Sequence, residues 1–343
     1  MASQGIASPF SIQDLAVLGV SDALRAYPLV LRRAEATARL AAREQPDAVV
    51  LIDSWGFMLR VARRLRKLRK PPILIKYVAP QVWATRPGRA RTLARTVDHL
   101  LTIHSFDAPA FTAEGLATTF VGNPVLNRDF SQADGARFRQ QRGIGPDAAL
   151  LLLLPGSRRG EVERLMPVFL KAVGVLRQAD PSLCIGVVAA DSQTDTINQA
   201  LASWPHPIHR IDGEADRLDA MRAATVAVAC SGTVTTELAL AGCPMVVAYR
   251  VGALTYAVAK RLIRTPYITL FNVAAQTLIA PELVQDACTG EALAREVSLR
   301  LRDPGLREDQ IFQQTSAVSR MRGGVQDPAD AAASAVIGVL ARA

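Results

Sequence analysis

The sequence contains 343 residues, of which 50% are hydrophobic and 21% are charged. At about 150 residues per domain, this length predicts two domains, and the apolar content excludes an intrinsically disordered chain. Lys and Arg total 40 against 31 acidic residues, which gives a formal net charge of +9. Residues 1–123 hold 17 basic and 9 acidic side chains, a net charge of +8, so an anionic partner is expected on this half only.

The composition also disfavours several classes of function. Aromatic residues form only 5% of the chain, and no helix-turn-helix, zinc-finger or aromatic strand motif is present, so no nucleic-acid partner is expected. The four cysteines lack CxxC spacing and fit free thiols in a reducing compartment, while the four histidines form no metal-ligand pair. With neither a secretory signal nor a clean membrane-spanning run, we expect a soluble protein, cytoplasmic or peripheral to a membrane.

The first half of the chain alternates apolar runs with amphipathic stretches. One helix is expected from Phe57 to about Lys70, and four apolar runs predict strands at residues 48–52, 73–77, 99–103 and 119–121. Strands separated by helices of this length indicate βαβ units and a mostly parallel sheet. Because the first strand comes only at residue 48, this domain is expected to be incomplete, without an opening strand–loop–helix unit.

A polar stretch at residues 127–147 predicts a linker with a short helix, after which the same pattern restarts. A helix is expected at residues 161–179, and apolar runs predict strands at 150–154, 183–189, 208–211, 226–229 and 245–248. The sequence therefore predicts an α/β protein with two Rossmann-like domains facing a cleft, in which ligands bind beyond the carboxyl ends of the strands. The expected divisions are residues 1–126, 127–147, 148–325 and a C-terminal helix at 326–343.

Two strand-to-helix turns of the second domain resemble anion sites. Pro155-Gly156-Ser157-Arg158 follows a strand, so backbone N–H groups would face an anion, and the Arg158 guanidinium suits a diphosphate. Ser231-Gly232-Thr233 also follows a strand, and Glu237 lies one helical turn beyond, suited to ribose hydroxyls. An ordinary strand-to-helix turn with a solvated arginine would explain the first alone, and helix capping by Thr233 or Thr235 the second. Together, and without a Walker lysine, they favour a nucleotide-sugar site over an ATPase.

Candidate residues in the first domain also follow strands. Asp53 comes directly after residues 48–52 and suits a general base acting on an acceptor hydroxyl, although an N-cap role would also explain it. Trp83, Arg86 and Arg89 follow the next strand and could line a site for an anionic, partly apolar ligand. Basic runs at 60–70, with seven Lys or Arg, and 86–95, with four, suit anionic lipid head groups or a solvated helix face.

Several segments, taken in chain order, resemble lipid-A-disaccharide synthases. They are YVAPQVWATRPGR (77–89), residues 120–124, LPGSRRGE (154–161), SGTVTTE (231–237), PMVVAYR (244–250), and Asn272 with PELVQ (281–285). The resemblance extends from about Gly5 to Cys288. It implies an inverting GT-B glycosyltransferase of lipid A biosynthesis, which uses neither a metal nor a cofactor. Such an enzyme condenses UDP-2,3-diacylglucosamine with 2,3-diacylglucosamine 1-phosphate, forming a β-1,6-linked disaccharide and UDP.

The resemblance also implies roles for individual residues. Asp53 corresponds to the catalytic base, and Arg158 and Asn272 to essential donor-side residues. The implied UDP-binding residues are Gly156, Ser157, Arg158, Ser231, Gly232, Thr233, Thr235, Glu237, Glu282 and Gln285. The implied acceptor or lipid-side residues are Gln81, Trp83, Arg86 and Asn123. The resemblance further implies homodimers and peripheral association with the anionic, cytoplasmic face of the inner membrane.

The chain departs from the family pattern at several positions. Trp55-Gly56-Phe57-Met58 replaces Pro-Asp-Phe-Asn, Asn123 replaces a histidine, and Gln276-Thr277 replaces Gly-Arg, so acyl-chain or acceptor preference is expected to differ. Met1–Gly5 aligns after the family's opening strand and Gly-Glu-Ala-Ser-Gly-Asp loop, so a longer native polypeptide is expected. The alternatives are another UDP-sugar GT-B enzyme, such as the peptidoglycan N-acetylglucosaminyltransferase or a UDP-sugar epimerase, and a truncated non-catalytic remnant that binds UDP or lipid.

Overall fold

The computed structural model describes residues 5, 8–10 and 20–342, without the side chains of 20–26, 253, 254, 258 and 259. The expectation about Met1–Gly5 falls almost wholly outside these residues. Within the described part of the chain, no helix is both long enough and apolar enough to span a bilayer. The chain divides into two compact units, which we call unit 1 (Met1–Val121 with Ala329–Ala343) and unit 2 (Gly122–Pro328).

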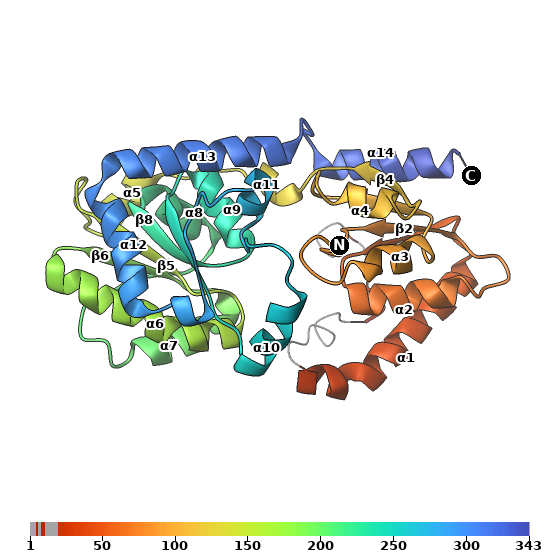
Figure 1. Cartoon of the computed structure of the whole chain (residues 1–343), viewed down its shortest axis with the longest axis horizontal. Helices are drawn as coiled ribbons and strands as arrows, with labels where there is room; N and C mark the ends of the chain where they lie inside the picture. Colours follow the sequence, from red (N-terminus) through yellow and green to blue (C-terminus); the bar gives the residue numbers. More distant parts are fainter. Residues whose placement is uncertain (1–4, 6–7, 11–19, 343) are drawn as a thin grey trace. The chain divides into compact units, whose positions relative to one another are not determined.

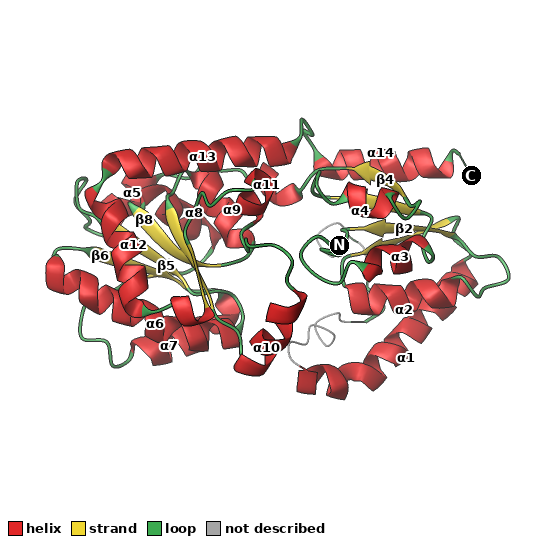
Figure 2. Ribbon diagram, viewed as in Figure 1, coloured by secondary structure: helices red, strands yellow, loops and turns green. Residues whose placement is uncertain are grey.

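Unit 1 is a three-layer α/β arrangement (Figures 1 and 2). Its sheet is parallel throughout, in the order β1-β2-β3-β4. Its elements are α1 (Val20–Glu44), β1 (Ala48–Ile52), α2 (Trp55–Leu65), β2 (Ile73–Tyr77), α3 (Gly88–Ala94), β3 (His99–Thr102), α4 (Ala108–Thr112), β4 (Ala117–Phe120) and α14 (Pro328–Leu340).

The two faces of this sheet are covered by different segments of the chain. Leu51, Leu74 and Leu100 lie on one face and pack in a single core with α1, α2, α3 and α4. Ile75 and Leu101 point to the other face, where apolar residues of α14 pack against them. The C-terminal helix therefore completes the first unit. Strand β1 is the edge of the described sheet, and its Val50 and Ile52 are 37% and 46% exposed.

Unit 2 contains a larger parallel sheet, in the order β10-β9-β8-β5-β6-β7. Its first elements are the 3-10 turn Pro124–Asn127, α5 (Gly135–Gln141), β5 (Leu150–Leu154), α6 (Arg159–Ala179), β6 (Cys184–Val188), α7 (Thr194–Leu201), β7 (His209–Ile211) and α8 (Glu214–Ala223). They are followed by β8 (Val226–Cys230), α9 (Thr233–Ala241), β9 (Met245–Tyr249), α10 (Ala253–Leu262), α11 (Leu270–Ala275), β10 (Glu282–Val284), α12 (Gly290–Arg302) and α13 (Pro304–Arg322).

Strand β5, five consecutive leucines, is buried on both faces, as expected for the centre of a parallel sheet. Leu151 and Leu153 pack with α6, α7 and α12, whereas Leu150, Leu152 and Leu154 pack with α5, α8, α9, α11 and α13. After β5 the chain adds β6 and β7 on one side, and then crosses to add β8 on the other. The boundary between β5 and β8 is thus the topological switch point, where open α/β sheets bind ligands.

The predicted strand positions are confirmed, with β1, β2 and β5 matching to the residue and the others to within two residues. The predicted end of the helix at Lys70 is wrong, because α2 ends at Leu65. The Arg66 backbone N–H closes the last turn on Ala62, and its side chain binds Asp98 (2.6 Å) and the Thr96 carbonyl (2.8 Å). Pro71 follows soon after and disfavours a longer helix.

Candidate functional site

A pocket of about 480 Å³ lies at the switch point of unit 2. It is formed where strands β5, β6 and β8 end and where helices α6, α8 and α9 begin. Its lining residues are Leu154, Gly156–Arg158, Glu161, Val188–Asp191, Gly213, Glu214, Arg217, Cys230–Val234 and Glu237. Burial raises the pKa of the Cys230 thiol to about 12, so this pocket residue stays protonated and is a poor nucleophile.

Both predicted anion turns lie on this pocket, and each depends on a glycine. Gly156 has φ +112°, and a Cβ there would lie 2.6 Å from the Glu161 carboxylate, so a side chain would meet both strain and a clash. Gly232 has φ +154° and precedes α9, where its carbonyl accepts hydrogen bonds from the Thr235 backbone (3.2 Å) and hydroxyl (2.7 Å). The N-terminus of α9 thus begins at the pocket wall, with the positive end of its dipole there.

Arg158 forms an ion pair with Glu161 at the mouth of the pocket, with 2.8 Å between Nη1 and Oε1. The Arg158 side chain is 57% exposed, whereas that of Glu161 is 13% exposed. The hydrogen bond to Glu161 raises the pKa of Arg158 above its usual value, so the guanidinium is permanently charged. An incoming anion can therefore reach the Arg158 guanidinium from solvent while its Nη1 stays bound to the Glu161 carboxylate.

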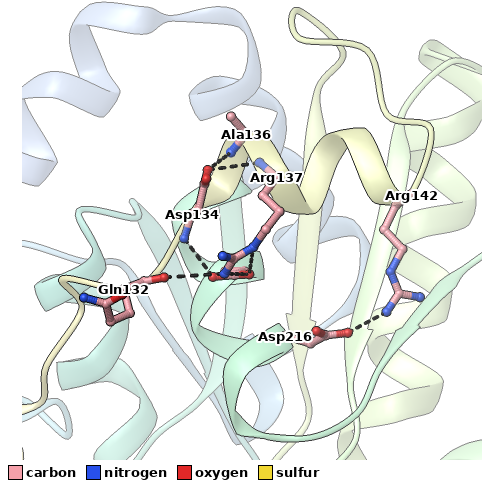
Figure 3. Close-up of polar contacts among 7 residues, drawn as sticks. Gln132, Asp134, Ala136, Arg137, Arg142 and Asp216 are labelled. Atoms are coloured by element: carbon pink, nitrogen blue, oxygen red, sulfur yellow. Dashed lines mark hydrogen bonds and ion pairs between the residues drawn. The ribbon is translucent and has the colours of Figure 1, made fainter.

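Arg217 is a pocket residue that the sequence did not single out. It donates to Glu237 through both terminal nitrogens, over 2.8 Å and 3.3 Å, and so neutralises a buried carboxylate. Helix α8, which carries Arg217, is held by α5 and by the residue that follows α5 (Figure 3). There Arg142 pairs with Asp216 (2.8 Å), and Arg137 pairs with Asp219 (2.6 Å). The stretch expected to be a linker therefore helps to position the pocket.

Three predicted UDP-binding residues do not line the pocket. Thr235 is fully buried, and its hydroxyl is used by the Gly232 carbonyl. Glu282 accepts hydrogen bonds from the backbone N–H groups of Ile268 (2.9 Å) and Thr269 (2.8 Å). Gln285 both accepts from and donates to the backbone of Val251. These three side chains stabilise the surrounding loops.

Asn272, predicted as an essential donor-side residue, is also buried away from the pocket lining. Its amide oxygen accepts from the backbone N–H groups of Ile279 (2.9 Å) and Ala280 (3.1 Å). Its amide nitrogen donates to the Ala280 carbonyl (2.9 Å) and to Glu282 (2.8 Å). All four hydrogen-bonding positions of the amide are therefore occupied within the protein. This geometry favours a structural role for Asn272, in holding the loop at 265–285.

In unit 1, Asp53 directly follows β1 and is exposed. Asp53 and Ser54 have φ of 45° and 39°, which is unfavourable for residues with a Cβ, and Val78, the first residue after the next strand, has φ 71°. Strained backbone of this kind concentrates at functional sites. The Ser54 side chain makes no capping hydrogen bond to α2, and the turn is held from β2, where the Asp53 N–H donates to the Tyr77 carbonyl (3.0 Å).

The buried Lys76 lies next to Asp53 and was not among the predicted site residues. Its ammonium donates to the carbonyls of Leu51 (3.2 Å), Asp53 (2.8 Å) and Tyr77 (2.9 Å). Burial lowers the pKa of Lys76 to about 8, with the charge of Asp53 acting in the opposite direction. A lysine in the middle of an otherwise apolar strand was the only available signal.

The predicted acceptor-side residues have different environments. Gln81 and Arg86 are exposed, with Arg86 at φ 51°, whereas the Trp83 indole N–H donates to Asp107 over 2.9 Å. Burial raises the pKa of Asp107 to about 7, although this hydrogen bond acts in the opposite direction. Asn123 belongs to unit 2, is buried, and accepts from the Val125 N–H to cap the turn at Pro124–Asn127. That contact gives Asn123 a structural role.

Comparison with solved structures supports the architecture. A structure of S. aureus MnaA with UDP has a TM-score of 0.61 at 12% identity, covering 94% of this chain and 81% of that chain. The UDP-GlcNAc 2-epimerase of Neisseria meningitidis, bound to UDP-GlcNAc, has a TM-score of 0.55 at 13% identity, covering 92% and 82%. MurG of Acinetobacter baumannii has a TM-score of 0.53 at 16% identity, covering 85% and 74%. These likenesses confirm the predicted GT-B type of α/β fold with two Rossmann-like domains.

Sequence comparison gives closer relatives. The lipid-A-disaccharide synthase of Rhodospirillum centenum is 42% identical over 342 residues, covering 100% of this chain and 85% of that protein. The synthase of Gluconobacter oxydans is 39% identical over 342 residues, covering 99% and 81%. The sequence model of the lipid-A-disaccharide synthetase family matches residues 1–336. The chain therefore belongs to the lipid-A-disaccharide synthetase family.

Proposed function

We propose that this protein is an inverting glycosyltransferase that joins UDP-2,3-diacylglucosamine to 2,3-diacylglucosamine 1-phosphate in lipid A biosynthesis. The observation that carries the proposal is the pocket at the β5/β8 switch point, with its two glycine turns and Arg158, in a chain of this family. The relatives named above are lipid-A-disaccharide synthases, which supports the same reaction for this protein.

The chemistry of the pocket suits a nucleoside diphosphate. Backbone N–H groups at the start of α9 and the exposed Arg158 guanidinium would receive the diphosphate. The carboxylates of Glu214 and Glu237, which also line the pocket, suit hydroxyl groups of the ribose or sugar. The departing UDP gains negative charge as its bond to the sugar breaks, and Arg158 would stabilise that charge.

In unit 1, Asp53 is the proposed general base. Its exposed carboxylate would take the proton from the acceptor hydroxyl, and the oxygen would attack the anomeric carbon as the bond to UDP breaks. One C–O bond forms, one C–O bond breaks, the proton moves to Asp53, and attack opposite the leaving group inverts the anomeric centre. Asn272, Glu282 and Gln285 would support the reaction through the loops that they hold.

The same proposal includes a peripheral position on an anionic membrane. A groove of about 850 Å³ between α2 and α3 in unit 1 is lined by six basic side chains: Arg63, Arg64, Arg66, Lys67, Arg91 and Arg95. Glu35, Asp98 and Glu114 pair with Arg64, Arg66 and Arg91. Of the ion pairs between described residues, none includes Arg63, Lys67 or Arg95, so their charges are available to lipid phosphates.

The proposal is tested with both lipid substrates in an assay of UDP release. The wild-type protein should release UDP only when both substrates are present, and Asp53→Ala and Arg158→Ala should each abolish most of the activity. UDP binding measured by calorimetry separates their roles, because only Arg158→Ala should weaken it. Glu163→Ala, which removes an exposed carboxylate on α6, is the matched control. Wild-type protein that binds UDP but never turns over would contradict the proposal and favour a non-catalytic UDP-binding protein.

A further inference from the structure

Lys76 is the most deeply buried cationic side chain near the candidate base. It lies at the fourth position of β2, is 3% exposed, and stands opposite Leu51 in the β1–β2 register. All three ammonium protons have backbone carbonyl acceptors, on Leu51, Asp53 and Tyr77. None of the ion pairs between described residues includes Lys76. A charge buried in this way is costly, and an apolar side chain would pack here without that cost.

The positions of its three carbonyl acceptors indicate the structural role of the Lys76 ammonium. Leu51 lies within β1, Tyr77 is the last residue of β2, and Asp53 is the first residue beyond β1. The Tyr77 carbonyl also accepts from the Asp53 N–H over 3.0 Å. Both backbone polar groups of Asp53 are therefore tied to the end of β2, the N–H directly and the carbonyl through the Lys76 ammonium.

This double attachment coincides with an unfavourable backbone conformation. Asp53 and Ser54 both adopt left-handed φ values, which their Cβ atoms disfavour. Two adjacent residues keep such unfavourable φ values only where contacts with the surrounding structure hold the backbone in place. Beyond the pair, the Met58 N–H donates to the Ser54 carbonyl (2.9 Å), which joins the turn to the start of α2. The direction of the exposed Asp53 carboxylate consequently depends on the contact between Lys76 and the Asp53 carbonyl.

We propose that Lys76 is a positioning residue for the reaction: its ammonium holds the left-handed turn at Asp53–Ser54 and so directs the Asp53 carboxylate toward the acceptor hydroxyl. This inference rests on the proposed function of Asp53 as the general base. Lys76 does not touch substrate in this role, and it acts only through the backbone of Asp53. A misdirected base slows the chemical step without weakening the binding of UDP to its pocket in unit 2.

The test compares Lys76→Met, which keeps the length of the side chain but loses the donors, with Lys76→Arg, which keeps a charged donor. Lys76→Met should lower kcat about tenfold or more. The KM of the UDP donor and the calorimetric Kd of UDP should stay within about twofold of wild type. Lys76→Arg should recover part of kcat. Lys260→Met removes an exposed lysine of unit 2 that belongs to none of the proposed sites, and it should leave every value unchanged.

Hydrogen exchange gives a readout that does not require turnover. In Lys76→Met, the amides of Asp53 and Met58 should exchange faster, while those of β3 keep their protection. Unchanged kcat in Lys76→Met, or unchanged exchange at Asp53, would overturn the inference. A Lys76→Met protein that loses UDP affinity in proportion to kcat would also overturn it, since that pattern indicates general damage. If Asp53→Ala retains full activity while Lys76→Met alters the exchange, the proposed base is wrong although the attachment is real.

Discussion

Arg217 and Glu237 form a two-point ion pair in the pocket of unit 2, with Nη1 to Oε2 at 2.8 Å and Nη2 to Oε1 at 3.3 Å. The Glu237 side chain is 7% exposed and that of Arg217 is 25% exposed, so the pair is largely shielded from water. Arg128 lies farther away, with its Nε 3.9 Å from Glu237. The pair links α8 to α9 and neutralises the Glu237 carboxylate beside a site proposed for a diphosphate.

Removal of Glu237 should therefore destabilise unit 2 more than removal of an exposed acid. We expect Glu237→Ala to lower the free energy of unfolding by about 2–3 kcal/mol, because Arg217 is left with a partly buried, unpaired charge. Urea unfolding measures the change, and Glu163→Ala, whose partner Arg159 is 78% exposed, should cost less than about 0.5 kcal/mol. Equal effects of the two substitutions would show that the pocket pair is not shielded.

Asn272→Ala should also destabilise the protein. The substitution removes the acceptor of the buried Ala280 N–H, leaves the Ile279 N–H with only the Thr277 carbonyl (3.2 Å), and removes one donor from Glu282. We expect a loss of about 2–4 kcal/mol in the free energy of unfolding. The exposed Thr277, in the same loop, provides the control Thr277→Ala, which should be nearly neutral. An inactive Asn272→Ala protein of wild-type stability would instead indicate direct contact with the substrate.

Gly156→Ala should impair UDP binding. The new Cβ would lie 2.6 Å from one Glu161 oxygen and 3.0 Å from the Glu161 Cβ, in a backbone conformation that L-residues rarely adopt. The turn must shift, so the affinity for UDP should fall about tenfold or more, which calorimetry measures. At Gly145 a new Cβ meets only Ala148, at 3.8 Å, so Gly145→Ala is the matched control. Wild-type UDP affinity in Gly156→Ala would place the diphosphate elsewhere.

Asp107 should make stability depend on pH. Its pKa in the folded protein, about 7, is above the ordinary value of 3.8, so its protonated form is favoured by folding. Its contribution to the free energy of unfolding is complete below about pH 4 and is lost as the pH rises toward 7. His104 has the opposite effect. Burial lowers its pKa from 6.5 to about 4, so its contribution to the free energy of unfolding is lost as the pH falls below 6.5.

Asp107→Asn isolates the first of these effects. The difference in Tm between the variant and wild type should shift in favour of the variant by a few degrees between pH 5 and pH 8, because asparagine does not ionise. Thermal unfolding at both pH values measures the shift, and taking the difference between variant and wild type cancels the shared contribution of His104. A difference that is constant across this range would mean that Asp107 is ionised at both values.

Vesicle binding should depend on the three basic residues of the unit 1 groove that take part in no ion pair between described residues. At about 1 kcal/mol per residue, replacing Arg63, Lys67 and Arg95 with glutamine should weaken binding to phosphatidylglycerol vesicles about 100-fold. Replacing the exposed Arg295, Arg302 and Arg320 of unit 2 removes the same charge and serves as the control. Co-sedimentation measures both. If the two triple variants bind alike, total charge and not the groove of unit 1 determines the association.

The parallel sheets were predictable because their strands are short apolar runs between clear turns. Short apolar runs such as the five leucines of β5 and Ala48–Ile52 are typical of buried strands. Strand β10 was missed, since it has only three residues and begins with a glutamate whose carboxylate binds a neighbouring loop. The closing helix was expected from its alanines, but nothing in its sequence indicates that it packs on the sheet of unit 1.

The candidate site was predictable where the residues that form it are adjacent in the sequence, as in the turn Gly156–Arg158. It was not predictable where a contact joins distant parts of the chain. Arg217 was missed because its partner lies 20 residues away on another helix. The family resemblance selected Asn272, but its four hydrogen bonds depend on the path of the following loop and could not be deduced from residue type.

The exposed edge of β1 has a practical consequence for the purified protein. Among the described strands β1 pairs only with β2, so its outer row of backbone N–H and carbonyl groups has no strand partner within the described part of the chain, and such an edge can pair with another extended chain. Val50 and Ile52 add exposed apolar surface beside that row. Concentrated solutions should therefore form soluble aggregates by strand addition, and Ile52→Lys should delay them in light scattering while leaving UDP affinity in unit 2 unchanged.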